Sequence, residues 1–235
     1  MAKSKQLELV LPTHGGARKG AGRKRSTPRP TVPHVARPAF VASRPVQVTM
    51  RVVAGVSSLR ANDVWSVVVD TLRALRQLSS FRVVHLSVMS NHLHLLVEAD
   101  DGDAFEYGMR ALTVRLALRI NRVLGRRGRL FENRYHARAL ATPREVALSL
   151  QYVLLNARKH AAERGRELPH EWVDPRSSAP AFDGWEGRSA VCPDERDFGV
   201  ALARTWLLRV GWRRYGLLRV DAVPGATHRR LADAA

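Results

Sequence analysis

Cysteine is almost absent from this chain of 235 residues, since Cys192 is the only one. An internal disulfide is therefore excluded, which fits a reducing, cytoplasmic environment. Long apolar runs are also missing, because no stretch approaches the length of a membrane span and the N-terminus lacks the apolar segment of a secretory signal. We therefore expect no membrane partner.

Acidic residues are scarce: 21 Asp and Glu stand against 39 Lys and Arg, giving a net charge of +18 and a pI near 11.4. We expect such a chain to bind a polyanion, most often nucleic acid. Glycine-rich phosphate loops, dinucleotide fingerprints, cysteine-based zinc patterns and internal repeats are all lacking. These absences remove the commonest nucleotide-binding and zinc-binding classes.

Half of the excess charge lies in residues 1–44, where ten Lys and Arg stand against Glu8 alone. The segment is proline-rich and has too few apolar groups to fold by itself, so we predict a flexible basic arm. Such an arm can follow a phosphate backbone, or it can be a solvated tail. The residues of the arm that we expect at DNA are Arg18, Lys19, Arg23, Lys24 and Arg25.

Apolar residues from position 45 onwards follow the periods of regular structure. Alternation predicts a strand at 45–53, and an apolar stripe predicts a helix at 61–78 that Ser58 or Asn62 could cap. Residues 81–99 read as a hairpin with its turn at Ser90-Asn91, and 102–125 read as a second helix with Val123 in its apolar stripe. The order is strand, helix, strand, strand, helix.

The second strand of this hairpin carries His92 and His94. Residues two apart point to the same side of a strand, so we expect both imidazoles to face one spot and to supply two ligands of a metal site. The alternative is a pair of surface histidines on a polar strand face. In the first strand of the hairpin, the alternation predicts that Val84, Leu86 and Val88 lie on the same face.

Arginines dominate residues 115–138, with eight of them against Glu132. Aromatic residues interleave with them, as is typical where bases stack and guanidinium groups hold phosphates. The alternative is a salt-bridged helix face, but few acids lie nearby. The arginines that we expect at DNA are Arg115, Arg119, Arg122, Arg126, Arg127, Arg129, Arg134 and Arg138.

A third helix is predicted from Thr142 to about Arg164, with Thr142 as N-cap and Glu145 closing a capping box. Tyr152 and Asn156 are four residues apart and so share a face of this helix. We expect Arg158 and Lys159, on the same helix, to contact DNA. Residues 166–235 read as an irregular C-terminal extension without an assignable role.

Three segments together resemble the single-tyrosine HUH transposases, specifically the REP-associated tyrosine transposases and their insertion-sequence relatives. Residues 88–97, V-M-S-N-H-L-H-L-L-V, resemble the family's histidine–hydrophobic–histidine strand. Residues 128–138 resemble the basic segment that leads to the catalytic helix, and residues 151–160, Q-Y-V-L-L-N-A-R-K-H, resemble that helix. The similarity covers residues 45–165, which would form the transposase domain.

The resemblance implies a ferredoxin-like α+β sandwich, with an antiparallel sheet and helices on one face. It implies that His92, His94 and Asn156 bind Mg²⁺ or Mn²⁺ and that Tyr152 is the nucleophile. A nucleoid-associated monomer or homodimer would then cleave and rejoin single-stranded or hairpin DNA through a 5′-phosphotyrosine. The family often has proline after this asparagine, whereas Ala157 follows here, so we expect a longer helix.

Three other functions compete with this one. A non-catalytic DNA-binding regulator on the same scaffold would be signalled by loss of the tyrosine or a histidine, and neither is lost. An RNA-binding protein with an RRM-like sheet would need an aromatic-rich strand, which is missing. A zinc hydrolase would need a carboxylate beside the histidines.

Overall fold

A four-stranded antiparallel sheet forms the centre of the structure, a computed structural model that describes residues 38–187 and 197–225. The strands are β1 (Val46–Arg51), β2 (Phe81–Val88), β3 (His92–Ala99) and β4 (His136–Ala139), in the spatial order β2-β3-β1-β4. With helices α1 (Asn62–Leu75) and α2 (Gly102–Val123) between them, the chain follows the order β-α-β-β-α-β. This is the ferredoxin-like arrangement, and the expected α+β class is confirmed.

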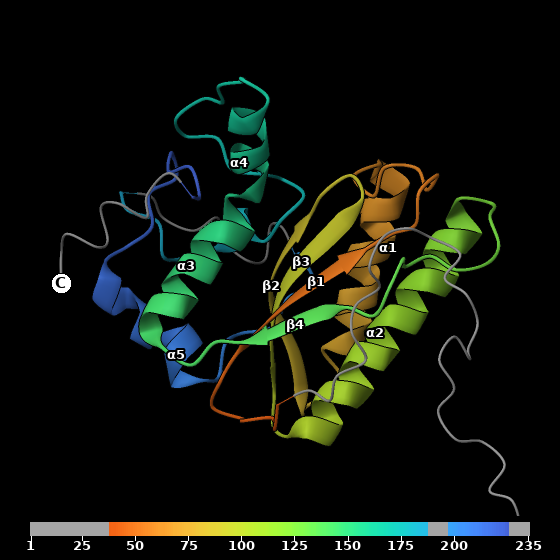
Figure 1. Cartoon of the computed structure of the whole chain (residues 1–235), viewed down its shortest axis with the longest axis horizontal. Helices are drawn as coiled ribbons and strands as arrows, with labels where there is room; N and C mark the ends of the chain where they lie inside the picture. The colour runs from red at the N-terminus through yellow and green to blue at the C-terminus, as the bar shows by residue number, and fades with distance from the viewer. Residues whose placement is uncertain (1–37, 188–196, 226–235) are drawn as a thin grey trace, which may run out of the picture. The chain divides into compact units, whose positions relative to one another are not determined.

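Helices α1 and α2 cover one face of the sheet (Figure 1). Alternate residues of each strand point to this face, so valines and leucines of β1 and β3 meet the apolar stripes of both helices. Gly108 lets α2 approach the sheet end closely, because a Cβ there would lie 2.1 Å from the ring of Phe81. Val123, expected in this core, is instead exposed at the end of α2.

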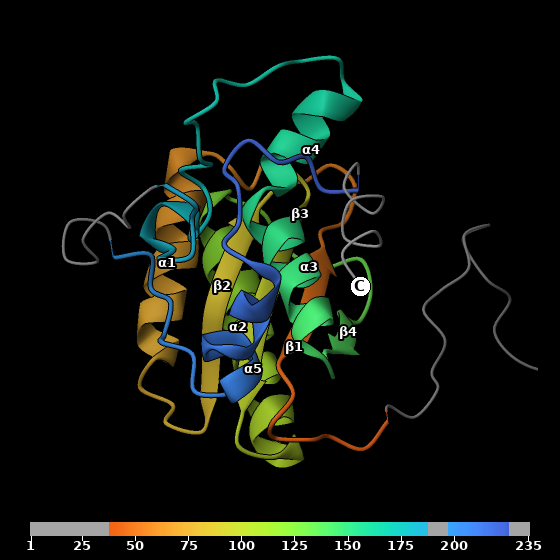
Figure 2. The same cartoon turned by 90° about the vertical axis from the view of Figure 1, so that its left-hand side faces the viewer.

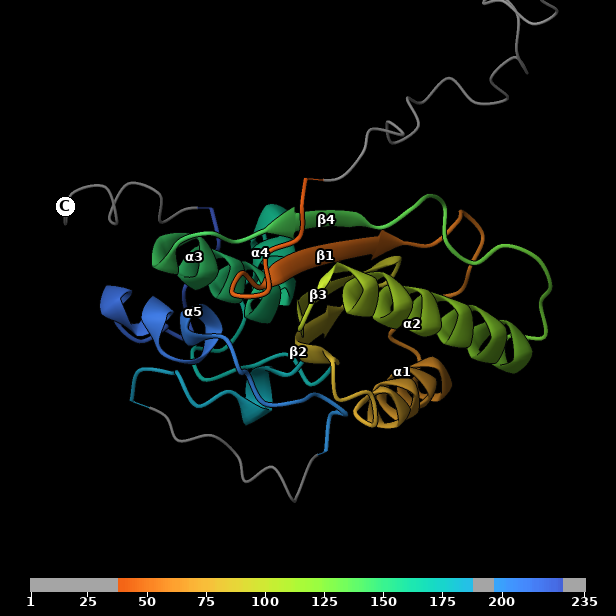
Figure 3. The ribbon, with the colours of Figure 1, turned by 90° about the horizontal axis from the view of Figure 1, so that it is seen from below.

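The opposite face of the sheet is covered as well, by α3 (Pro143–Leu154) and by the C-terminal segment (Figure 3). Val84 and Leu96 of the sheet pack there with Val146, Leu150 and Trp212. Every residue of β3 is therefore buried. The segment includes α5 (Trp206–Arg209) and the short 3₁₀ helices η1 (Ala179–Ala181) and η2 (Gly211–Tyr215), and α5 lies beside α3 (Figure 2).

Residues after 165 are attached to the sheet by specific polar bonds. The amide N–H of Val88 donates to the carbonyl of Arg176, and that of Ser178 donates to the carbonyl of Leu86. The guanidinium of Arg60 makes two hydrogen bonds, of 2.8 and 2.7 Å, to the buried carboxylate of Asp174. The extension expected to be irregular is thus short of regular structure but well packed.

Several local predictions were wrong for identifiable reasons. A bulge between Val83 and His85 reverses the alternation, so Val84 faces α3 while Leu86 and Val88 face α1 and α2. Helix α1 begins after Ala61 without a side-chain cap, and it ends at Leu75 rather than Leu78. Strand β4 was missed because a four-residue edge strand of alternating small and charged residues has little hydrophobic pattern.

The third helix is divided, although no proline interrupts it. Leu155 adopts φ −107° and ψ 15°, which ends α3 and begins α4 (Asn156–Glu163), so the expected longer helix is wrong. The N-terminal prediction, by contrast, is confirmed: Thr142 accepts from the amide of Glu145, and Glu145 closes the capping box. The break at Leu155 changes the direction of the chain between Tyr152 and Asn156.

The predicted division into residues 1–44, 45–165 and 166–235 stays a prediction, and most of the basic arm lies outside the described residues. Phe40, placed in the arm, stacks on Phe105 with ring centroids 5.4 Å apart. Across residues 38–187 and 197–225, the structure has no helix with the length and apolar character that a bilayer crossing requires.

Glu98 gives a test of how the C-terminal segment is held. Its carboxylate, fully enclosed, accepts from the amides of Arg204 and Thr205 and lies 3.5 Å from the guanidinium of Arg82. Arg82 keeps its ion pair with Asp100 at 2.7 Å, so the loss comes from the amides of Arg204 and Thr205, which are left without an acceptor. Because unsatisfied buried donors are costly, Glu98→Ala should lower the free energy of unfolding by about 3 kcal/mol. Urea denaturation measures this, and Glu98→Gln, which keeps an acceptor oxygen, should lose less. Equal losses in both variants would contradict the argument.

Candidate functional site

His92 and His94 lie on β3 and face α3, on the side of the sheet opposite to α1 and α2. Their neighbours Leu93 and Leu95 point into the α1/α2 core, which fixes this orientation through the strand alternation. The two imidazole centroids are 4.7 Å apart and the rings are nearly perpendicular. The predicted convergence of the two side chains on one spot is therefore present in the structure.

Tyr152, in the last turn of α3, meets this pair directly. Its ring centroid lies 5.0 Å from that of His94, edge to face. His160, two turns further along on α4, lies 5.9 Å from His92 by the same measure. The helix pair thus presents residues 152 and 160 to the two histidines, with Asn156 on the turn between them.

The histidine nitrogens have distinct partners. Nδ1 of His92 lies 2.7 Å from the side-chain oxygen of Asn91, an acceptor, so Nδ1 carries the proton and Nε2 presents a lone pair. Nδ1 of His94 lies 3.0 Å from the hydroxyl of Thr49, its neighbour across the strands. Bonds of this kind orient a histidine whose other nitrogen binds a metal.

Both imidazoles are held neutral. Burial lowers the pKa of His92 to about 4, helped by the nearby charges of Arg51 and His160. Burial also lowers the pKa of His94 to about 3, with smaller contributions from His92, His160, Lys159 and Arg51. Neutral imidazoles are the form that binds metal ions, and here they need lose no proton at neutral pH.

A metal ion would fit the unpaired atoms of this site. Within the part of the chain that the structure describes, Nε2 of His94 and both side-chain atoms of Asn156 are buried without hydrogen-bond partners. Orphaned buried polar groups are costly, and a bound ion with its waters would satisfy them. No cluster of three His, Cys, Asp or Glu residues suited to a metal occurs in the described ranges. Asn156 therefore stays the predicted third ligand.

Two groups beside the site were missed from the sequence. His160 lies one helical turn beyond Asn156, a spacing that could have been noticed, and its Nδ1 is 2.7 Å from the carboxylate of Glu163. Arg51 is paired with His92 only through the strand register, which the sequence does not reveal. Lys159 was expected at DNA, and its ammonium nitrogen lies 5.1 Å from the ring centroid of Tyr152.

Arg158, also expected at DNA, is a structural residue instead. Its guanidinium is buried and donates to the carbonyls of Leu168, Pro169, His170 and Trp172. Burial lowers its pKa, but the four acceptors keep the charge solvated by protein. The side chain fastens α4 to the following loop and is not available to a phosphate.

The arginines of residues 115–138 lie on different surfaces. Arg115, Arg119 and Arg122 are exposed on α2, which covers the face of the sheet away from the histidines. Arg138 is exposed on β4, where it pairs with Glu145 at 2.7 Å. The cluster that looks continuous in the sequence is therefore split by the sheet, and its DNA contacts stay a prediction.

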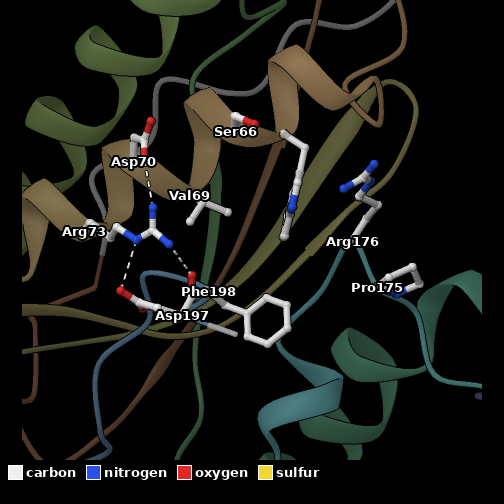
Figure 4. Close-up of a pocket in the computed structure, with 9 residues that line it drawn as sticks. Ser66, Val69, Asp70, Arg73, Pro175, Arg176, Asp197 and Phe198 are labelled. Carbon is white, nitrogen blue, oxygen red and sulfur yellow. Dashed lines mark hydrogen bonds and ion pairs between the residues drawn. The ribbon is translucent and has the colours of Figure 1, made fainter. Parts of the chain in front are cut away.

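An open pocket of about 560 Å³ lies at α1, away from the histidines. Figure 4 shows Arg73 between Asp70 and Asp197, so the charged groups in this pocket neutralise one another. The guanidinium of Arg176 lies over the ring of Trp65 and donates to Asn62. With Arg73 paired to both carboxylates and the Trp65 ring covered by Arg176, this pocket offers no reactive group comparable to Tyr152.

Comparison with known proteins found no matching family model and no matching curated protein. Among solved structures, one of a REP-associated tyrosine transposase bound to a REP hairpin is 14% identical, with a TM-score of 0.48, over 61% of this chain and 81% of that one. A candidate transposase from Deinococcus radiodurans R1 is 15% identical, with a TM-score of 0.37, over 57% and 100%. A bacterial tRNA(His) guanylyltransferase-like protein in complex with GTP is 12% identical, with a TM-score of 0.38, over 57% and 74%.

The neutral histidines predict a dependence of stability on pH. The unfolded chain takes up protons at these imidazoles near pH 6.5, whereas the folded chain does so only near pH 4 for His92 and pH 3 for His94. The free energy of unfolding should therefore fall as the pH falls from 6.5 to 4. His94→Gln should reduce this slope by up to about 1.4 kcal/mol per pH unit.

Urea denaturation between pH 6.5 and 4.5, with a chelator present, measures the effect. His136→Gln is the control, because His136 is exposed in the same cross-strand row, opposite Thr49. Equal slopes for His94→Gln and the wild-type chain would refute the prediction.

Proposed function

We propose that the chain is a single-tyrosine DNA transposase that cleaves and rejoins single-stranded or hairpin DNA with a divalent metal ion. The observation that carries the proposal is the contact of Tyr152 with His94 from a distant segment, and the buried, unpaired amide of Asn156 one turn after Tyr152 supports it. A tyrosine next to a pair of neutral histidines places a nucleophile beside two groups that can bind a metal ion, which suits phosphodiester exchange through a tyrosine. The motif order in residues 88–160 supports the same family.

The reaction would be a transfer of the phosphodiester to Tyr152. The phenolic oxygen attacks phosphorus, the bond to the 3′ oxygen breaks, and the 3′-hydroxyl leaves with a proton. The phenol proton passes to water or a neighbouring group. Because the phosphotyrosine conserves the energy of the broken bond, the 3′-hydroxyl of another strand can reverse the step without ATP.

His92, His94 and Asn156 would hold Mg²⁺ or Mn²⁺, which supplies charge stabilisation to the scissile phosphate when bound. The chain itself supplies three further positive or proton-carrying groups around the same spot: Lys159 beside the Tyr152 ring, Arg51 beside His92, and His160. These groups favour an anionic ligand there. The positive charge around the site thus suits the binding of a phosphate backbone.

Tyr152→Phe tests the nucleophile, because it removes one hydroxyl and leaves the ring contact with His94 intact. The covalent adduct with a labelled oligonucleotide should disappear on a denaturing gel, while oligonucleotide affinity changes by less than about twofold. Tyr107→Phe, at an exposed tyrosine on α2, is the matched control and should retain the adduct. Adduct formation should require Mg²⁺ or Mn²⁺ and stop with EDTA. Persistence of the adduct in Tyr152→Phe would exclude this nucleophile.

The basic arm gives a second test, independent of the chemistry. Deleting residues 1–37 removes nine Lys and Arg and one Glu but keeps Phe40, which packs on Phe105. Each lost phosphate contact should reduce the slope of log K against log salt by about 0.7 for single strands. Four or five contacts would then lower the slope by roughly three. Binding isotherms at several salt concentrations compare the two proteins, and identical slopes would make the arm a solvated tail.

A further inference from the structure

An aromatic and basic surface on residues 206–215 has no part in the chemistry proposed for Tyr152. We call it the Trp206 surface, and its members are Trp206, Arg209, Val210, Arg214 and Tyr215. Trp206 is 50% exposed and Tyr215 is 46% exposed. Large aromatic groups so exposed on a short, ordered segment point to a ligand rather than to the core.

The segment is fixed from beneath, so the exposed groups have defined positions. Leu207, Leu208 and Trp212 are buried in the core around α3. Thr205 caps α5 and donates to the buried carboxylate of Glu98. Trp206 lies close against Gly211, where a Cβ would come within 2.6 Å of the indole, so this glycine is needed for the position of the ring.

The charge of this surface is of one sign. Residues 198–220 contain five arginines and no Asp or Glu. Arg213 pairs with Asp183 and Arg219 with Asp221, but Arg209 and Arg214 have no acidic partner in the part of the chain described by the structure. The guanidinium of Arg214 instead lies over the Trp206 ring, 4.9 Å from its centroid. Two guanidinium groups without acidic partners and two exposed rings within residues 206–215 favour an anionic ligand with flat, apolar parts.

We propose that the Trp206 surface binds single-stranded DNA, namely the strand that flanks the bond cleaved at Tyr152. This proposal rests on the function proposed above for Tyr152. Bases stack on tryptophan and tyrosine with little sequence preference, while guanidinium groups contact the phosphates. A duplex keeps its base faces stacked internally and offers the rings nothing. An anionic membrane is the competing ligand, but α5 has only four residues, too few for an amphipathic helix lying in a bilayer surface.

The position of the surface suits a strand that continues away from the nucleophile. Figure 1 and Figure 2 place α5 beside the N-terminal half of α3, whereas Tyr152 lies in the last turn of that helix. Twelve residues of α-helix span about 18 Å. A short oligonucleotide held at Tyr152 would end before this surface, and a longer one would reach it.

Fluorescence anisotropy with labelled oligonucleotides tests the proposal. All proteins carry Tyr152→Phe, so that affinity is read without cleavage and whether or not Tyr152 is the nucleophile. Trp206→Ala should weaken binding of a long single strand by about 5- to 150-fold, the range for one stacked base. It should leave unchanged the binding of a short strand that ends a few nucleotides beyond the cleaved bond. Trp206→Phe, which keeps a stacking face, should recover most of the lost affinity.

Leu202→Ala is the matched control, because Leu202 is 88% exposed and lies outside the surface, and it should bind as the parent does. Arg214→Lys, which keeps the charge but loses the flat guanidinium, should lie between Arg214→Ala and the parent. Thermal unfolding of each variant verifies that it is folded. Unchanged affinity of folded Trp206→Ala for the long strand would overturn the proposal. Loss of binding to phosphatidylserine vesicles without loss for DNA would overturn it too.

Discussion

Strand β3 is buried on both faces, and this constraint organises the rest of the structure. Leu93, Leu95 and Val97 face α1 and α2, while His92, His94, Leu96 and Glu98 face the other side. Burying polar groups without partners is costly, so the second face needs hydrogen-bonding groups as well as apolar cover. Thr49, α3 and residues 204–205 supply them. The candidate site and the C-terminal segment thus both serve to bury the polar side chains of this face of β3.

Local patterns in the sequence were sufficient to predict several of these strands and helices. Period-two alternation located β1 and β3, and the capping box located the start of α3, because each depends on neighbouring residues only. The pairing of Arg51 with His92, the burial of Arg158 and the edge strand β4 depend on contacts between distant segments. Residue type and spacing alone do not encode them. The meeting of Tyr152 with His94 could be expected only from a family resemblance.

Positive charge is distributed over separate surfaces of the fold. The arginines of α2 lie over one face of the sheet, whereas Arg51, Lys159 and His160 surround the histidines on the other. A nucleic acid in contact with both would have to pass around an edge of the sheet. Sequence clustering of charge is therefore a poor guide to a continuous binding path, and the sheet decides which arginines can act together.

The late position of Trp212 has a consequence for synthesis on the ribosome. The first core needs little beyond Phe131, because its members run from Val46 to that residue. The second core draws on Trp212 and Val220. In a nascent chain that has folded its first half, Val84 and Leu96 are therefore covered in two steps: first by α3, and completely only when Trp212 emerges, about eighty residues after Phe131. During that interval the half-covered sheet is a surface for chaperones, and translation speed through residues 132–212 becomes a determinant of yield.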